Sequence, residues 1–92
     1  MFVWDDAKRE KVIETHGVDF ALILDVFDDP FGVYFEDEAH SSDEEVRFNL
    51  IGLSSRYGLL YVTFTYNDGG IRLITAWRAE KWAIKEYENY KR

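Results

Sequence analysis

Residues 46–77 read VRFNLIGLSSRYGLLYVTFTYNDGGIRLITAW, three apolar runs divided by polar turns. In the first run hydrophobic residues alternate with Arg47 and Asn49, which is the period of a strand with one buried face. The NDGG sequence at 67–70 supplies asparagine and glycine, which accept the left-handed backbone of tight hairpins. We therefore predict an antiparallel β-meander with strands at 46–53, 58–66 and 71–77.

The segments before this meander have helical signals. Asp5 or Asp6 can cap a helix at 7–16, and Gly17 can end that helix in a left-handed conformation. Hydrophobic residues spaced i, i+3, i+4 and i+7 predict a second helix at 20–27. Two further short strands are predicted at 2–4 and 32–37.

After the meander the helical period returns, and it predicts a last helix at 79–90. Its apolar stripe consists of Ala79, Ala83, Tyr87 and Tyr90. The predicted fold class is α+β, with two N-terminal helices, an antiparallel β-meander of three to four strands and a C-terminal helix. The 92 residues, 47% of them hydrophobic, are enough for one domain spanning 1–92.

Composition excludes several classes of protein. The chain has no cysteine, which rules out disulfides, thiolate zinc sites and a cysteine nucleophile. Its apolar runs are too short to span a membrane, and residues 1–15 mix acids and bases instead of forming a signal peptide. His40 lies in the acidic stretch EDEAHSSDEE, which predicts a solvated loop and matches no calcium or zinc motif. We expect a cytoplasmic protein without membrane association, metal or cofactor.

Charge is distributed unevenly along the chain. The net charge is −7, which opposes non-specific binding to nucleic acid. Residues 16–69 carry eleven acids and two bases, whereas residues 70–92 carry six bases and three acids. The C-terminal quarter can therefore present a local positive field to an anionic ligand.

Short motifs follow one another in a characteristic order along nearly the whole chain. They are Trp4-Asp5, Lys8, His16-Gly17-Val18, Phe20, Phe27-Asp28-Asp29-Pro30, Arg47, Gly52, Arg72, Arg78-Ala79 and Tyr87. From about Val3 to about Tyr87 the chain thus resembles the BrnT family, the toxin halves of bacterial type II toxin–antitoxin pairs. The resemblance implies a RelE-like fold, ribonuclease activity, and neutralisation by a BrnA antitoxin. BrnA also binds DNA, so the toxin would meet DNA only through its partner.

The chain departs from the family pattern just before the last helix. The family usually has two adjacent arginines there, whereas this chain has Trp77 followed by Arg78. One cation of the family site is therefore missing. We expect this change to affect catalysis more than it affects the fold or the binding of the partner.

RNA cleavage without a metal needs a base for the 2′-OH proton, cations on the phosphorane and an acid for the leaving oxygen. A guanidinium donates two parallel hydrogen bonds to a phosphate, so we predict that Arg72 and Arg78 clamp the scissile phosphate. The candidates for proton transfer are Lys8, His16, Lys85 and Tyr87. The candidates for substrate binding are Trp77, Lys81, Trp82 and Lys85.

Each candidate has a structural alternative. The spacing i, i+3 and i+7 places three basic residues on one face of the predicted helix: Arg78, Lys81 and Lys85. This face either binds RNA or is an ordinary solvated surface, in which case Trp82 covers the edge of the apolar stripe. By strand alternation Trp77 shares a face with Ile71, Leu73 and Thr75. Its ring either packs in the core or at a dimer contact, or it stacks on a base of the substrate. His16 either holds the helix end or transfers a proton.

Two hypotheses of function follow. The first is a metal-independent endoribonuclease toxin that is held inactive by a BrnA-like antitoxin. The second is a catalytically weakened BrnT-like interaction or regulatory module that keeps the partner surface without cleaving RNA. Arg72, Arg78 and Tyr87 favour the first, whereas Trp77 and the net charge of −7 favour the second.

Overall fold

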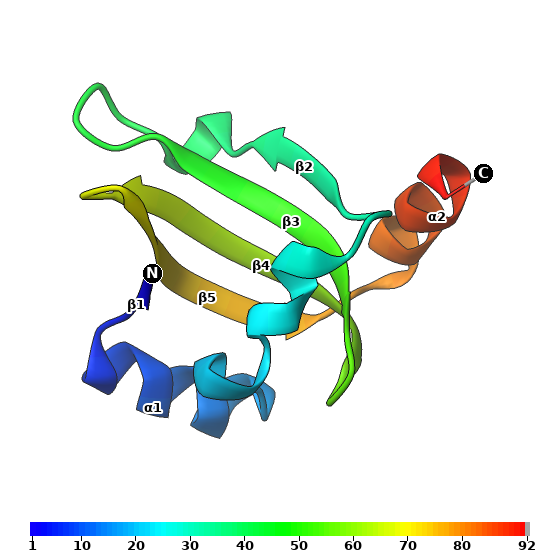
Figure 1. The fold of residues 1–92 in the computed structure, drawn as a ribbon, viewed down its shortest axis with the longest axis horizontal. Helices are drawn as coiled ribbons and strands as arrows, with labels where there is room; N and C mark the ends of the chain where they lie inside the picture. The colour runs from blue at the N-terminus through cyan, green and yellow to red at the C-terminus, as the bar shows by residue number, and fades with distance from the viewer. Residues whose placement is uncertain (92) are drawn as a thin grey trace.

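The computed structural model describes residues 1–91, and its centre is one mixed five-stranded sheet. The strands lie in the order β1-β5-β4-β3-β2 (Figure 1). Strands β2 to β5 pair antiparallel with their neighbours in sequence, and β1 pairs parallel with β5. The bounds are β1 Phe2–Val3, β2 Val33–Glu36, β3 Arg47–Ser54, β4 Gly58–Asn67 and β5 Gly70–Arg78. The predicted α+β class is confirmed.

Two α-helices lie at different ends of the sheet. Helix α1, Asp6–His16, lies along the β1–β5 edge, and helix α2, Lys81–Tyr90, follows the end of β5 (Figure 1). Asp5 caps α1 by accepting the N–H of Lys8, and Gly17 ends it at φ +68°, as the sequence predicted. Among residues 1–91 no helix is long and apolar enough to cross a membrane.

The predicted helix at 20–27 is wrong, because this segment forms two successive 3-10 helices, η1 Phe20–Leu22 and η2 Leu24–Asp28. Ile23 joins them in a non-helical conformation. Phe20, Ile23 and Val26 are all fully buried, and their spacing of three matches the 3-10 period better than the α period. A third 3-10 helix, η3 Glu38–His40, precedes β3.

The sheet has one covered face, which carries the main core. Leu50, Val62, Phe64 and Leu73 project from it and are buried against α1 and the 3-10 segment. Within the described part of the chain, the opposite face is covered only at one end, where Ala83 and Tyr87 of α2 pack against Ile51 of β3. Most of that second face therefore stays open.

A bulge in β5 changes which residues lie on the open face. Thr63 pairs with Thr75, but the next residue Phe64 pairs with Leu73, so Ile74 is an extra residue in β5. Strict alternation predicted Trp77 on the face of Ile71 and Leu73. The bulge reverses that prediction, and Trp77 lies on the open side, opposite Tyr61 of β4.

Helix α2 begins later than predicted. Strand β5 continues through Arg78, and the N–H of Ala79 still donates to the carbonyl of Leu59 at 3.0 Å. Arg78 therefore does not share a helix face with Lys81 and Lys85, and that predicted row is not formed. Tyr90, predicted to be buried, is 67% exposed, because the buried contacts of α2 with the sheet are made by Ala83 and Tyr87.

Asp29 connects α2 to the sheet. Its carboxylate accepts the N–H groups of Phe31 and Leu53, each at 2.9 Å, and the hydroxyl of Tyr87 at 2.8 Å. Burial raises the pKa of Asp29, but these three hydrogen bonds outweigh burial and lower the pKa below its usual value. Burial and the bond to Asp29 together raise the pKa of Tyr87 to about 12. Tyr87 is thus a neutral donor that fixes the helix.

Acid is expected to destabilise the fold through Asp19 and Asp29. The hydrogen bond from Arg9 lowers the pKa of Asp19 in the folded state, and the pKa of Asp29 is lowered too. A lowered folded pKa stabilises the protein above the unfolded pKa of about 4, and this contribution is lost as pH falls through the folded pKa. Urea midpoints measured from about pH 7 to about pH 2 should therefore fall at the acid end. An Asp19→Asn variant with an equally steep fall would contradict this assignment.

Candidate functional site

Polar and aromatic side chains gather on the uncovered part of the sheet. We call this surface the open sheet face and define it by Arg47, Tyr61, Thr63, Arg72, Thr75 and Trp77. A cleft of about 450 Å³ lies on it, and its lining adds Lys8 from α1 together with Asp37 and His40 from the segment before β3. Beneath the cleft Thr63 donates to Asn49 at 2.7 Å, so the polar floor is satisfied.

Helix α1 contributes to the cleft beside the bulge in β5. Lys8 of α1 and Ile74, the extra residue of the bulge, both line it. A second hollow next to the cleft is lined by four basic residues, Lys8 and Lys11 of α1 together with Arg47 and Arg72, and by one acidic residue, Asp5. Four cations from three separate segments therefore meet along one side of the open sheet face.

Glu45 orients the two arginines. Its carboxylate accepts Nε of Arg47 at 2.8 Å on one oxygen and Nη2 of Arg72 on the other. The hydrogen bond from Arg47, with the nearby charge of Arg72, lowers the pKa of Glu45 despite partial burial. Glu45 thus stays ionised at neutral pH and holds both guanidinium planes in place. Each guanidinium engages Glu45 through one nitrogen and has further N–H groups for another anion.

A row of aromatic rings lies on the open sheet face between the basic residues and α2. Trp77 and Tyr61 stack with ring centroids 5.1 Å apart and planes 8° apart, and the ring of His16 lies 5.5 Å from Trp77. On the other side of Tyr61, Trp82 and Phe35 pack edge-on at 5.6 and 6.0 Å. Burial raises the pKa of Tyr61, so its phenol is neutral at physiological pH. The flat Trp77–Tyr61 pair is suited to stacking on a planar ligand.

His40 and Asp37 form a polar pair at the rim. Nδ1 of His40 lies 3.1 Å from both carboxylate oxygens of Asp37, and its imidazole is 69% exposed. The predicted solvated loop is therefore partly ordered as η3, and it places His40 on the cleft. Among residues 1–91 no three histidine, aspartate or glutamate side chains converge as metal ligands.

The structure brings together only some of the predicted site residues. Arg72, Lys8 and Trp77 line the two hollows, and His16 lies beside Trp77. Trp82 reaches the open sheet face only through its contact with Tyr61. Lys81 and Lys85 are exposed on α2 and line neither hollow.

The predicted clamp of Arg72 and Arg78 is not formed. Arg72 pairs with Thr65 at one end of β5, whereas Arg78 pairs with Leu60 at the other end, roughly 20 Å away at the rise of a strand. Arg78 also lies on the opposite face, where its guanidinium stacks 5.4 Å from the ring of Tyr57. Extended strand geometry keeps the two arginines apart.

Tyr87 is not placed for proton transfer. Its side chain is only 3% exposed, and its hydroxyl donates to Asp29 beneath α2. A substrate on the open sheet face cannot reach this hydroxyl while α2 is docked. The burial of Tyr87 agrees with its predicted place on the apolar stripe of the last helix, and it conflicts with the predicted role in proton transfer.

Sequence reasoning missed most residues of the cleft, among them Asp37, His40, Arg47 and Tyr61. Arg47 had a usable signal, because it is polar in an otherwise apolar strand and faces away from the core. Tyr61 had the same alternation in β4. Asp37 and His40 lie in an irregular segment, and their approach to the cleft depends on the pairing of β2 with β3.

Residues 4–82 match the family described as the ribonuclease toxin BrnT of type II toxin–antitoxin systems. The crystal structure of the Brucella abortus ribonuclease toxin BrnT is similar, with a TM-score of 0.69 and 26% identity over 88% of this chain and 99% of that chain. No match is found among curated proteins. Because the family match extends over most of the sequence, this chain belongs to the BrnT family of ribonuclease toxins of type II toxin–antitoxin systems.

Proposed function

We propose that this chain is an endoribonuclease that cleaves RNA on its open sheet face without a metal. It acts in the cytoplasm and is held inactive by a BrnA-like antitoxin. One observation supports the proposal best: four cations adjoin a stacked aromatic pair on one uncovered surface. Cations bind the phosphates of single-stranded RNA, and flat rings stack on its unpaired bases.

The cations have a defined task in the reaction. When the 2′-oxygen attacks phosphorus, the P–O5′ bond breaks and negative charge builds on the non-bridging oxygens. Arg47 and Arg72, held by Glu45, can donate charge-assisted hydrogen bonds to those oxygens. Because both arginines are oriented beforehand, little reorganisation is needed as charge develops. The products are a 2′,3′-cyclic phosphate and a free 5′-hydroxyl.

Two protons must move in this step. Asp37 engages Nδ1 of His40, which leaves Nε2 free to accept the proton of the 2′-OH. Lys8 lines the same cleft and His16 lies beside Trp77, so either can return a proton to the leaving 5′-oxygen. This division keeps the proton acceptor and the proton donor on different segments of the chain.

Loss of the Trp77 ring is expected to weaken RNA binding. We expect Trp77→Ala to raise the dissociation constant about 5- to 150-fold, because stacking contributes roughly 1–3 kcal/mol per base. The measurement is fluorescence anisotropy with a labelled 2′-O-methyl RNA oligonucleotide, which cannot be cleaved. Trp77→Phe keeps a flat ring and should bind within about threefold of the parent. Equal affinity of the alanine variant would show that Trp77 serves only to cover Tyr61.

A second candidate function is a catalytically weakened interaction module. Trp77 stands where the family resemblance implies a cation, and Glu45 already binds both arginines of the open sheet face, Arg47 and Arg72. Growth of bacteria that express this chain without an antitoxin distinguishes the two candidate functions. An active ribonuclease should arrest growth, and Arg47→Ala should relieve the arrest. Normal growth at high levels of folded parent protein would favour the interaction module.

A further inference from the structure

Strand β2 forms a free edge of the sheet. It is last in the strand order, and β3 is its one strand neighbour among residues 1–91. The N–H of Asp37 donates inward to the carbonyl of Arg47 at 2.8 Å. Antiparallel pairing alternates, so Val33 and Phe35 also face β3 with their backbone groups. The backbone N–H and C=O groups of Tyr34 and Glu36 therefore point outward, available to another strand.

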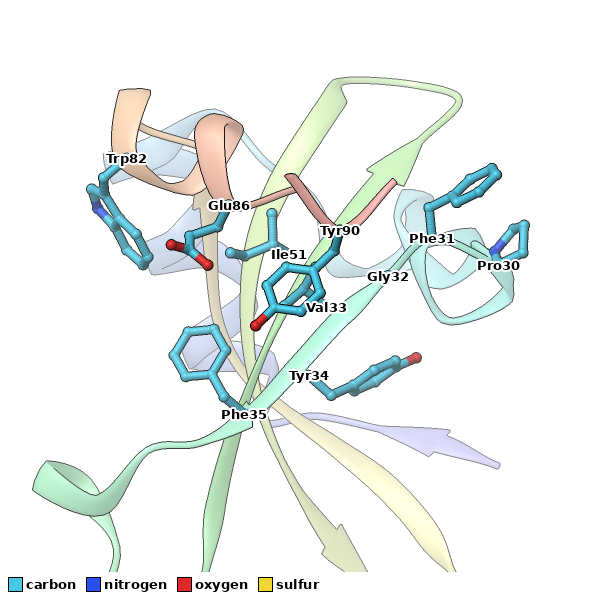
Figure 2. A pocket seen from close by; sticks show the side chains of 10 residues that line it. All are labelled: Pro30, Phe31, Gly32, Val33, Tyr34, Phe35, Ile51, Trp82, Glu86 and Tyr90. Carbon is cyan, nitrogen blue, oxygen red and sulfur yellow. The ribbon is translucent and has the colours of Figure 1, made fainter. Parts of the chain in front are cut away.

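A groove runs beside this edge, between β2 and α2. We call it the β2–α2 groove; it has a volume of about 600 Å³ and includes Val33, Phe35, Ile51, Trp82, Glu86 and Tyr90 (Figure 2). Ile51 is fully buried at its floor, whereas Phe35, Trp82 and Tyr90 are 36%, 49% and 67% exposed. Soluble proteins seldom leave such a cluster of aromatic side chains uncovered.

One carboxylate lies within this apolar groove. Among residues 1–91 Glu86 is the single charged residue of the lining, and Figure 2 shows its carboxylate pointing between Trp82 and Tyr90 toward the ring of Phe35. A carboxylate flanked by aromatic faces favours a lysine or arginine side chain, which gains an ion pair and cation–π contacts. The edge strand adds negative charge through Glu36 and the two acidic residues that follow it.

At the other end of the groove, near Phe31, a positive and a negative charge lie close together. Nζ of Lys91 lies 5.8 Å from the ring of Phe31, which also lines the groove, and Lys91 helps to lower the pKa of the nearby Asp29. The excess charge of the groove is therefore negative and lies at Glu86 and toward Glu36. A partner with its basic residues at the Glu36 end is favoured over the reverse orientation.

We propose that the β2–α2 groove binds an extended segment of the antitoxin in which apolar and basic residues alternate. The segment pairs its backbone with Tyr34 and Glu36, places apolar side chains on Phe35 and Trp82, and directs one basic side chain to Glu86. Only the identity of the partner rests on the proposed function. The chemistry of the segment follows from the free edge, the aromatic walls and the charge.

The groove also leads to the proposed active site. Phe35 and Trp82 both contact Tyr61, the ring that stacks on Trp77 at the cleft. A segment that continues past Glu36 along the open sheet face therefore covers the surface on which RNA would stack. Occupation of the groove thus couples partner binding to inhibition of cleavage.

The test uses a synthetic peptide, acetyl-Lys-Val-Thr-Arg-Thr-Val-Lys-amide, labelled with a fluorophore and titrated with the full chain. Fluorescence anisotropy should show saturable binding, and Glu86→Gln should weaken it about tenfold, because a charged hydrogen bond is lost. Glu88→Gln, an exposed change on the same helix outside the groove, should leave the affinity unchanged. A peptide with proline in place of its central threonines should not bind, because it cannot pair with β2.

Several results would overturn the groove proposal. They are no saturable binding up to about 1 mM, equal effects of Glu86→Gln and Glu88→Gln, or full binding of the proline peptide. RNA cleavage is measured separately on the same preparations. Peptide binding by a chain that cuts no RNA would reject the ribonuclease proposal alone, and cleavage without peptide binding would reject the groove alone. Arg47→Ala should bind the peptide normally.

Discussion

Replacing Arg47 with alanine is expected to lower the rate of RNA cleavage about 100- to 1,000-fold, the usual effect of removing one preorganised charge stabiliser. Arg47 lines both hollows of the open sheet face, and Glu45 fixes its guanidinium at 2.8 Å. Single-turnover cleavage of a labelled RNA oligonucleotide measures the chemical step directly. Arg47→Lys keeps the charge but loses the planar fork, so its rate should fall between those of the parent and the alanine variant.

Arg56→Ala is the matched control for this prediction. Arg56 is exposed in the turn between β3 and β4, and its guanidinium lies 6.0 Å from the ring of Tyr57, away from the cleft. Its removal changes the net charge by the same amount as Arg47→Ala. Equal losses in both variants would mean that overall charge, and not the open sheet face, governs cleavage.

Replacing Asp29 with alanine is expected to have the largest effect on stability, about 2–4 kcal/mol in the free energy of unfolding. The carboxylate accepts three hydrogen bonds, from Phe31, Leu53 and Tyr87, that join the start of β2, the end of β3 and α2. Without it the hydroxyl of Tyr87 is buried without a partner. For a chain of this size the melting temperature should fall by about 10–20 °C in a calorimetric scan.

Two variants test whether this effect belongs to the Asp29 network. Tyr87→Phe removes a single hydrogen bond and should cost about 1–2 kcal/mol. Asp28→Ala changes the exposed neighbour, which makes no side-chain hydrogen bond within residues 1–91, and should stay within about 0.5 kcal/mol of the parent. A Tyr87→Phe protein as stable as the parent would show that packing of Ala83 and Tyr87, not Asp29, holds α2.

The sequence predicted the strands well because their evidence is local. Alternation in 46–53 and 58–66 predicts β3 and β4, and the NDGG turn predicts the antiparallel pairing of β4 with β5. The cap at Asp5 and the left-handed Gly17 likewise define α1. Each of these features depends on residues that are neighbours in the chain.

The failures have longer-range causes. The buried spacing of Phe20, Ile23 and Val26 also fits a helix pattern, and only packing against the sheet selects the 3-10 form. The bulge at Ile74 leaves no mark in the alternating sequence, yet it turns Trp77 to the open side.

For the site, the sequence predicts a positive field in one continuous stretch, residues 70–92, because basic residues are concentrated there. The cations that meet in the structure come from α1, β3 and β5, and tertiary pairing alone brings them together. Lys8 and Arg72 are candidates that the sequence names. Arg47 belongs to the same motif set, but only the structure shows that it lies beside them.

Incubation of the purified chain with an RNA oligonucleotide and an excess of chelator tests the central claim most directly. The account predicts cleavage that persists with chelator, leaves a 2′,3′-cyclic phosphate and a 5′-hydroxyl, and is lost in Arg47→Ala. Intact RNA at high protein concentration, or cleavage that returns only when a divalent metal is added, would contradict a metal-independent ribonuclease on the open sheet face.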